Sequence, residues 1–316
     1  MHLVTVIVPN YNHSQYLKKR IDTILYQSYQ DLEIIILDDC STDNSKDIIE
    51  QYRICSKVSH IIYNKANSGS TFAQWNKGIN LAAGKYIWVA ESDDWCEHSF
   101  LEKMMNVFEA DATLGLVYCQ SWKVNEQDEI IGNMKEWTDY VDNEHWNHDF
   151  KSSGKQELQS YFYLRNTIPN ASAVVFKKAL FAPLSPQVLK MRLCGDKMVW
   201  TDLLSQTNIY FIADSLNYFR FHSNNVRSGI HSIQNLYENF VWFHYFSKRI
   251  PLSKEKSAQV KLWLMNWWQK VGRGNYQSKF FKRILLYAFK IDISFGFKVL
   301  NNLIATTKWK QWKRTV

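Results

Sequence analysis

The 316-residue chain has no apolar segment of the length that crosses a lipid bilayer, which is about 18 residues or more. Its first residues lead directly into a predicted strand, without the basic and apolar regions of a secretion signal. The five cysteines are scattered and lack C-x-x-C spacing, so neither a disulfide framework nor a zinc site is expected. The sequence also has no internal repeat. We therefore expect a cytoplasmic protein with no membrane-spanning segment.

Positive charge is concentrated at the end of the chain. Residues 248–316 hold 16 Lys and Arg but only two acids, a net charge of +14. Because the whole chain carries +8, residues 1–247 carry −6. Segments 258–271 and 278–290 place apolar side chains at helical spacing with basic residues between them, as helices at a membrane surface do. Packing on the preceding domain is favoured for the first segment. Contact with anionic lipid is favoured from Phe281 onward and for residues 308–314.

The first hundred residues alternate between predicted strands and helices. Apolar strand-like runs occupy 4–8, 32–37, 58–63 and 85–89, and helical segments occupy 14–27, 41–52 and 71–82. Apolar strands joined by helices predict a mostly parallel sheet covered on both faces. We expect an α/β domain over residues 1–230, with halves at 1–110 and 111–230. A basic, amphipathic helical region follows at 231–316.

Polar residues follow three of these predicted strands. P-N-Y-N at 9–12 ends the first strand, Asp38 and Asp39 end the second, and E-S-D-D at 91–94 ends the fourth. In an open α/β sheet, ligands bind beyond the carboxyl ends of the strands. The sequence therefore places all three clusters on one edge of the sheet.

Three acids, Glu91, Asp93 and Asp94, lie within four positions and repel one another. An isolated cluster of this kind is more often a solvated turn, but oxygen ligands so placed also suit Mg²⁺ or Mn²⁺. Such a cation would let an acidic edge bind a nucleoside diphosphate. Asp39 could then hydrogen-bond to the base and Tyr11 could stack on it.

Four motifs in order carry a resemblance to a known family: V-x-V-I-V-P-N-Y-N at 4–12, L-D-D-x-S-T-D at 37–43, N-K-G-I-N-x-A-x-G-K-Y-I at 76–87 and E-S-D-D-W at 91–95. They resemble the inverting family 2 glycosyltransferases of GT-A fold, over roughly residues 3–230. The family has Asp where this chain has Glu91, at the start of its D-x-D motif. The resemblance implies metal-dependent transfer of a sugar from a nucleotide-diphosphate donor, a UDP-sugar foremost, to a saccharide or lipid-linked acceptor. The implied setting is bacterial surface-polysaccharide synthesis on the inner face of the cell membrane.

The resemblance also implies roles for individual residues. The donor site would comprise Pro9, Tyr11, Asn12, Asp39, Asn67, Asn76 and Asp93. The Mn²⁺ or Mg²⁺ ligands would be Asp94 above all, with Asp93, Glu91 and His222, while Arg220 and Arg227 would neutralise the diphosphate. Other interpretations stay open. Asp38 and Asp43 could cap a turn, Asn67 and Asn76 could satisfy backbone groups, and His222 could be structural.

Inverting transfer needs a base that removes the proton of the acceptor hydroxyl. Asp196 opens an apolar helix after Gly195, where similar family members carry their base, so Asp196 is the expected base. An N-terminal cap of that helix is the alternative. Residues 166–172 are expected on the acceptor side. The aromatic residues Trp137, Trp146 and Tyr161 could stack on sugars or lie in the core.

Two other functional classes compete with glycosyl transfer. A sugar nucleotidyltransferase would use a Gly-rich, basic phosphate loop after the first strand, and residues 9–12 are not one. A non-catalytic module would bind carbohydrate, or nucleic acid through the basic tail. The acidic edge disfavours nucleic acid, and retention of Asp93, Asp94 and Asp196 favours an enzyme.

Overall fold

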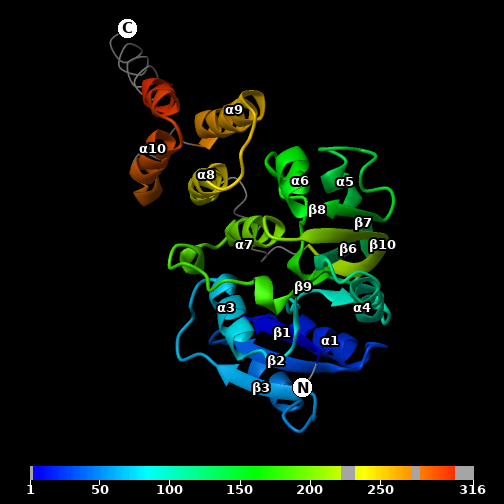
Figure 1. Cartoon of the computed structure of the whole chain (residues 1–316). Coiled ribbons are helices and arrows are strands. Elements are labelled where there is room, and N and C mark those ends of the chain that lie inside the picture. Colours follow the sequence, from blue (N-terminus) through cyan, green and yellow to red (C-terminus); the bar gives the residue numbers. More distant parts are fainter. Residues whose placement is uncertain (1–2, 222–231, 272–277, 303–316) are drawn as a thin grey trace. The chain divides into compact units, whose positions relative to one another are not determined.

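The computed structural model describes residues 3–221, 232–271 and 278–302 (Figure 1). The chain divides into two compact units, residues 1–223 and 224–316. The first unit is built around a single ten-stranded sheet, and the second is helical.

The sheet of the first unit is mostly parallel, as the sequence predicts. Its strand order is β3-β2-β1-β4-β9-β6-β10-β5, with β7 paired to β6 and β8 paired to β10. The strands are β1 (Val4–Asn10), β2 (Leu32–Asp38), β3 (Val58–Tyr63), β4 (Tyr86–Val89), β5 (Trp95–Cys96), β6 (Leu114–Val124), β7 (Ile130–Asn133), β8 (Phe150–Ser153), β9 (Val174–Lys177) and β10 (Asn208–Arg220). In the eight-strand path, only β9 and β5 run against the others.

Helices cover both faces of the parallel half. They are α1 (Ser14–Leu25), α2 (Ser45–Glu50), α3 (Thr71–Leu81) and α4 (Phe100–Ala110). On one face, Val4, Val6 and Val8 of β1 belong to a core cluster with side chains of α1 and α4. On the other face, a Cβ at Gly78 of α3 would lie 2.5 Å from the Ile7 side chain, so this helix packs closely because the position is glycine.

The second half of the unit is less regular. Its helices are α5 (Lys135–Thr138), α6 (Gly154–Glu157) and α7 (Gly195–Leu204), with a π-helical turn at Leu158–Phe162 and 3₁₀ turns at Ala171–Ala173, Lys178–Leu180 and Val188–Lys190. The sequence predicts two strands at 209–213 and 216–221. They are one strand, β10, whose register against β6 shifts between Ile212 and Asn217. The polar Asp214 and Ser215 therefore mark an irregularity in a strand and not a turn.

The second unit contains α8 (Ile233–Ser247), α9 (Lys254–Val271) and α10 (Lys279–Ile291), and residues 293–302 are also helical. Its core includes Leu264 and Trp268 of α9 and Ile284 of α10. The ring of Phe281 packs on that of Trp268 with 5.0 Å between centroids. Phe281, expected to face a membrane, is instead buried inside this unit. No helix in the described parts of the chain is both long and apolar enough to span a bilayer.

Candidate active site

The loops that follow β1 and β2 are joined by hydrogen bonds. Asn10 Nδ2 donates to Asp38 Oδ1 over 2.8 Å, and the backbone N–H of Asn12 donates to Ser41 Oγ over 2.9 Å. The backbone N–H of Thr42 donates in return to Asn12 Oδ1 over 2.7 Å. Asn12 has φ 55°, in the left-handed region that asparagine tolerates. Two motifs far apart in sequence thus form one structural unit at the carboxyl edge of the sheet.

Two acids of these loops serve the backbone. Asp38 accepts hydrogen bonds from the backbone N–H and hydroxyl of Ser41. Asp43 accepts from the backbone N–H groups of Ser14 and Ser45, the first residues of α1 and α2. Burial opposes ionisation of Asp43, yet the hydrogen bonds from Ser45 and Ser14 outweigh it and lower the pKa of this carboxyl. The arrangement matches the capping interpretation of both residues.

Asp39 lies beside these caps and is 95% buried. Its carboxylate accepts hydrogen bonds from Asn64 Nδ2 over 2.6 Å, from the hydroxyl of Ser68 over 2.7 Å and from Gln74 Nε2 over 2.9 Å. Asp39 is therefore fixed by α3 and by the loop that precedes it. By contrast, the ring of Tyr11 is 43% exposed.

The other residues expected near the donor bind backbone groups. Asn67 Oδ1 accepts a hydrogen bond from the backbone N–H of Gly69, which has φ 72°. Asn76 Oδ1 accepts one from the backbone N–H of Leu184 over 3.0 Å. Pro9 is buried in β1, paired with Leu37 of β2. The contacts of Asn67 and Asn76 match the alternative interpretation, in which these side chains satisfy backbone groups.

Glu91, the first acid after β4, is held by α3. Its Oε1 accepts hydrogen bonds from Trp75 Nε1 over 2.8 Å and from Thr71 Oγ1 over 3.1 Å. Its backbone N–H donates to Ser172 Oγ over 3.1 Å. Burial, reinforced by the negative charge of Asp93, raises the pKa of Glu91 to about 8. This side chain therefore holds a proton at neutral pH unless a cation compensates its charge.

Asp94 is held from the opposite side, by β10. It is 2% exposed, and its Oδ1 accepts a hydrogen bond from the backbone N–H of Arg220 over 3.0 Å. Burial and the charge of Asp93 raise the pKa of Asp94 to about 7, although the cation of Arg20 offsets part of this rise. Asp93 between them is only half-buried. The chain thus concentrates three carboxyl groups where β4 ends.

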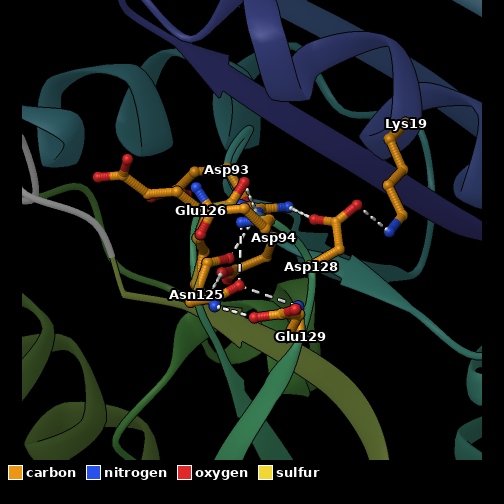
Figure 2. A network of polar contacts seen from close by, with 9 residues as sticks. Lys19, Asp93, Asp94, Asn125, Glu126, Asp128 and Glu129 are labelled. Carbon is orange, nitrogen blue, oxygen red and sulfur yellow. Dashed lines mark hydrogen bonds and ion pairs between the residues drawn. The ribbon is translucent and has the colours of Figure 1, made fainter.

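The guanidinium of Arg220 fixes the turn around Asp93. Its Nε donates to the backbone carbonyl of Asp93 and its Nη1 to that of Asn125, both over 2.8 Å. Its Nη2 pairs with Asp128, which also pairs with Lys19 (Figure 2). Arg220 is 1% exposed. The sequence predicts that Arg220 neutralises the diphosphate. In the structure its guanidinium instead contacts groups of the protein and supports the acidic turn.

Asp196 lies in the first turn of α7, where the sequence predicts a catalytic base. Its Oδ2 accepts a hydrogen bond from Asn166 Nδ2 over 2.8 Å. At the preceding Gly195, a Cβ would lie 2.5 Å from the ring of Phe72, so α7 meets α3 at a position that requires glycine. Phe72 directly follows Thr71, which contacts Glu91. One helix, α3, therefore contacts both the acidic cluster and the start of α7.

The segment 166–172 makes a second connection between these acids. Asn166 at one end binds Asp196, and Ser172 at the other end accepts from the backbone of Glu91. The backbone carbonyl of Ser172 also accepts from Trp88 Nε1 of β4 over 2.8 Å. The segment expected on the acceptor side is thus built into the same site as the acids.

Four remaining expectations concern individual side chains. His222 and Arg227 lie outside the described residues. Trp146 is buried in the core, where its Nε1 donates to the hydroxyl of Tyr118 over 2.9 Å. Tyr161 is half-buried and stacks on His145 beside it. Trp146 therefore follows the core interpretation.

Among the described residues, no three His, Cys, Asp or Glu side chains form a complete metal cage. Mg²⁺ in nucleotide sites commonly takes only one or two carboxylates and completes its shell with phosphate oxygens and water. The acids at 91–94 have oxygen donors and raised pKa values that a cation would lower. They fit a partial site that a bound diphosphate would complete.

Residues 5–175 match the family described as Glycosyl transferase family 2, and the chain belongs to that family. A Bacillus subtilis protein named for teichuronic acid biosynthesis, TuaG, is 40% identical over 103 residues, which cover 33% of this chain and 40% of TuaG. Chondroitin synthase of Pasteurella multocida is 34% identical over 139 residues, or 44% of this chain and 14% of that enzyme. The chain thus spans less than half the length of these curated relatives.

Solved structures show the same fold. Staphylococcus aureus TarS residues 1–349 in complex with UDP-GlcNAc superimposes with a TM-score of 0.66, 15% identity and coverage of 93% of this chain and 82% of that one. The mannosyltransferase PcManGT from Pyrobaculum calidifontis, in complex with GDP-Man and Mn²⁺, gives 0.58 at 13% identity, with 98% and 82% covered. The fold is the GT-A fold of glycosyltransferases.

The raised pKa of Glu91 predicts that replacing its carboxyl group by an amide changes how the stability of the protein depends on pH. An unfolded glutamate loses its proton near pH of about 4, whereas folded Glu91 keeps it to about pH 8. Stability contributed by the protonated form is therefore lost as pH rises between these values. Without divalent metal, the melting temperature of the Glu91→Gln variant relative to that of wild type should increase by about 3 °C or more as the pH is raised from 5 to 8.5. Differential scanning fluorimetry measures this shift.

The exposed Glu109 provides the control, because Glu109→Gln removes the same carboxyl group from a side chain that is not buried. Its melting temperature should follow the wild-type curve at every pH. A Glu91→Gln curve parallel to both would show that the carboxyl at 91 ionises freely.

Proposed function

We propose that the chain transfers a sugar, with inversion, from a nucleotide-diphosphate donor to a hydroxyl of a saccharide or lipid-linked acceptor. The observation that carries this proposal is the linkage of Asp196 to the acidic cluster through α3 and segment 166–172. The setting proposed is synthesis of a bacterial surface polysaccharide, in line with the names of the relatives above. Solved neighbours bind UDP, UDP-GlcNAc and GDP-Man, which supports a nucleotide-sugar donor.

The base of the donor would lie between Tyr11 and Asp39. The exposed ring of Tyr11 offers a face for stacking, and the buried Asp39 carboxylate is fixed in place to accept an N–H of the base. Uracil supplies such an N–H. Pro9, Asn12, Asn67 and Asn76 would shape this pocket through the backbone contacts described above.

The acidic cluster would hold Mn²⁺ or Mg²⁺ through Asp93 and Asp94, with Glu91 beside them and His222 as the further predicted ligand. When bound, the cation would supply positive charge that stabilises the departing diphosphate. Arg220 acts here as a positioning residue, because its guanidinium donates to the backbone carbonyl of Asp93 and its backbone N–H donates to the Asp94 carboxylate. Arg227 stays the predicted contact to phosphate.

Asp196 would accept the proton of the acceptor hydroxyl. The hydroxyl oxygen then forms a bond to the anomeric carbon while the bond from that carbon to the diphosphate oxygen breaks on the opposite side. The electron pair leaves with the diphosphate. Asn166 orients the Asp196 carboxylate for this role through a 2.8 Å hydrogen bond.

An Asp196→Asn change should abolish transfer while donor binding survives. The amide cannot take the proton but can still accept from Asn166, so the rate should fall at least about a hundredfold. Release of nucleoside diphosphate from several nucleotide sugars, with Mn²⁺, Mg²⁺ or chelator and an acceptor extract, measures the rate. UDP affinity should stay within about twofold.

Asp202 lies on the same helix and serves as the matched control. Its change to Asn should leave the rate within about threefold of wild type. Full transfer by Asp196→Asn would remove Asp196 from the role of base. Formation of nucleoside triphosphate and sugar 1-phosphate from the nucleotide sugar and added pyrophosphate would instead indicate a nucleotidyltransferase.

The second unit presents a surface suited to peripheral contact with an anionic membrane. Lys282, Leu286 and Lys290 recur at four-residue intervals on α10 and are all exposed. Ile293 and Phe297 continue the exposed apolar side chains, at 70% and 53% exposure. Apolar and basic groups together favour the interface of anionic lipid. A lipid-linked acceptor would place the enzyme there.

Charge reversal at Lys282 and Lys290 should weaken binding to vesicles that contain phosphatidylglycerol. Each lysine near an anionic surface contributes about 1 kcal/mol, so the double Glu variant should bind at least about tenfold more weakly. Flotation with phosphatidylglycerol and with pure phosphatidylcholine vesicles measures this. The same reversal at exposed Lys85 and Lys155 of the first unit is the control. Equal flotation of both variants would refute this contact surface.

A further inference from the structure

A half-buried arginine, Arg165, lies next to the segment that holds Asp196. Its guanidinium carbon lies 3.4 Å from the centroid of the Trp137 ring and 4.9 Å from that of Tyr140. Among the residues that the structure describes, Arg165 makes no hydrogen bond and no ion pair. A guanidinium stacked flat on a ring keeps its N–H donors at its edge, directed away from the ring. The donors of Arg165 are thus available for a ligand.

The surroundings of Arg165 make an unpaired cation costly. Burial lowers the pKa of Arg165, and no carboxylate of the described residues pairs with it. Its charge also contributes to the lowered pKa of Lys197, for which burial is the main cause. Lys197 is thus close enough to both Asp196 and Arg165 for their charges to affect its pKa. A bound oxyanion would neutralise the positive charge of Arg165, which no described side chain neutralises.

The position of Arg165 relates this site to the candidate base. Trp137, the ring beneath the guanidinium, donates through Nε1 to the backbone carbonyl of Asn166 over 2.7 Å. Asn166 in turn holds Asp196. The ring of Tyr140 is 75% exposed and offers a face on which a sugar can stack. A ligand at Arg165 would therefore lie beside the hydroxyl that loses its proton.

We infer that Arg165, Trp137 and Tyr140 form an acceptor subsite for a saccharide that carries a carboxylate or phosphate group. This inference rests on the proposed glycosyl transfer. The planar fork of the guanidinium would bind two oxygens of the anionic group, while Tyr140 contacts the sugar ring. A donor diphosphate presents similar oxygens. The acceptor is favoured because the contacts of Arg165 come from residues 137 and 140, whereas the acidic cluster and Asp39 belong to residues before 110.

Paired ligands that differ in one charged group test the subsite. Methyl β-D-glucuronide is compared with methyl β-D-glucoside, and glucose 6-phosphate with glucose, by ligand-observed NMR on the full chain. Wild type should bind an anionic member at least about tenfold more tightly than its neutral partner. Arg165→Gln should reduce that ratio to about one, and Arg165→Lys should restore part of it. Raising NaCl from 50 to 500 mM should weaken only the anionic ligand, which tests wild type even if the Gln variant misfolds.

The control is Arg53→Gln, which removes the same charge from an exposed arginine paired with Glu50. It should leave the ratio unchanged. No preference in wild type, or a preference that survives Arg165→Gln in a folded protein, would overturn the subsite. If Arg165→Gln lowered the affinity for UDP but left the ratio of anionic to neutral ligand affinity unchanged, Arg165 would belong to the donor site. The acceptor subsite would then be overturned as well. These measurements need no turnover, so a failure of glycosyl transfer in the Asp196 experiment is a separate result.

Discussion

Mutual repulsion among three carboxylates at the end of β4 is the constraint on which the site depends. Two elements hold these acids. Thr71 and Trp75 of α3 donate to the Glu91 carboxyl, whereas Arg220 at the end of β10 donates to the Asp94 carboxylate and to the backbone carbonyl of Asp93. Burial and proximity raise the pKa of Glu91 to about 8 and that of Asp94 to about 7. A cation would release this stored repulsion, which suits a site that must bind an anionic diphosphate.

The same contacts place the acids relative to Asp196. Helix α3 contacts Glu91 through Thr71 and Trp75, and its Phe72 packs against Gly195. Segment 166–172 contacts Glu91 through Ser172 and Asp196 through Asn166. Two independent elements therefore fix the distance between the acidic cluster and the candidate base. Rigid support of this kind is what a transfer between two bound substrates requires.

Much of this arrangement could be predicted from the sequence, because local patterns determine it. The apolar runs predict the strands, and the parallel sheet then brings Tyr11, Asp39 and residues 91–94 to one edge.

Long-range contacts could not be predicted. Arg220 ends a strand, where a phosphate ligand could lie, but its pairing with the turn at 125–129 is visible only in three dimensions. Phe281 has the spacing of a membrane helix, yet it packs on Trp268. Thr71 and Trp75 are four positions apart and so share one face of α3. This spacing could have indicated that both donate hydrogen bonds to the same acid, Glu91.

The central claim, that the carboxylates after β4 bind a divalent cation together with a nucleoside diphosphate, is tested most directly by titration calorimetry. Mn²⁺ is titrated into the chain with saturating UDP, at pH 7 and in buffers of different ionisation enthalpy. The account predicts uptake of one Mn²⁺ with release of protons, because Glu91 is protonated and Asp94 is partly protonated at that pH. It also predicts loss of uptake in Asp93→Asn. Absence of Mn²⁺ uptake in the presence of UDP, or uptake unchanged by Asp93→Asn, would contradict it.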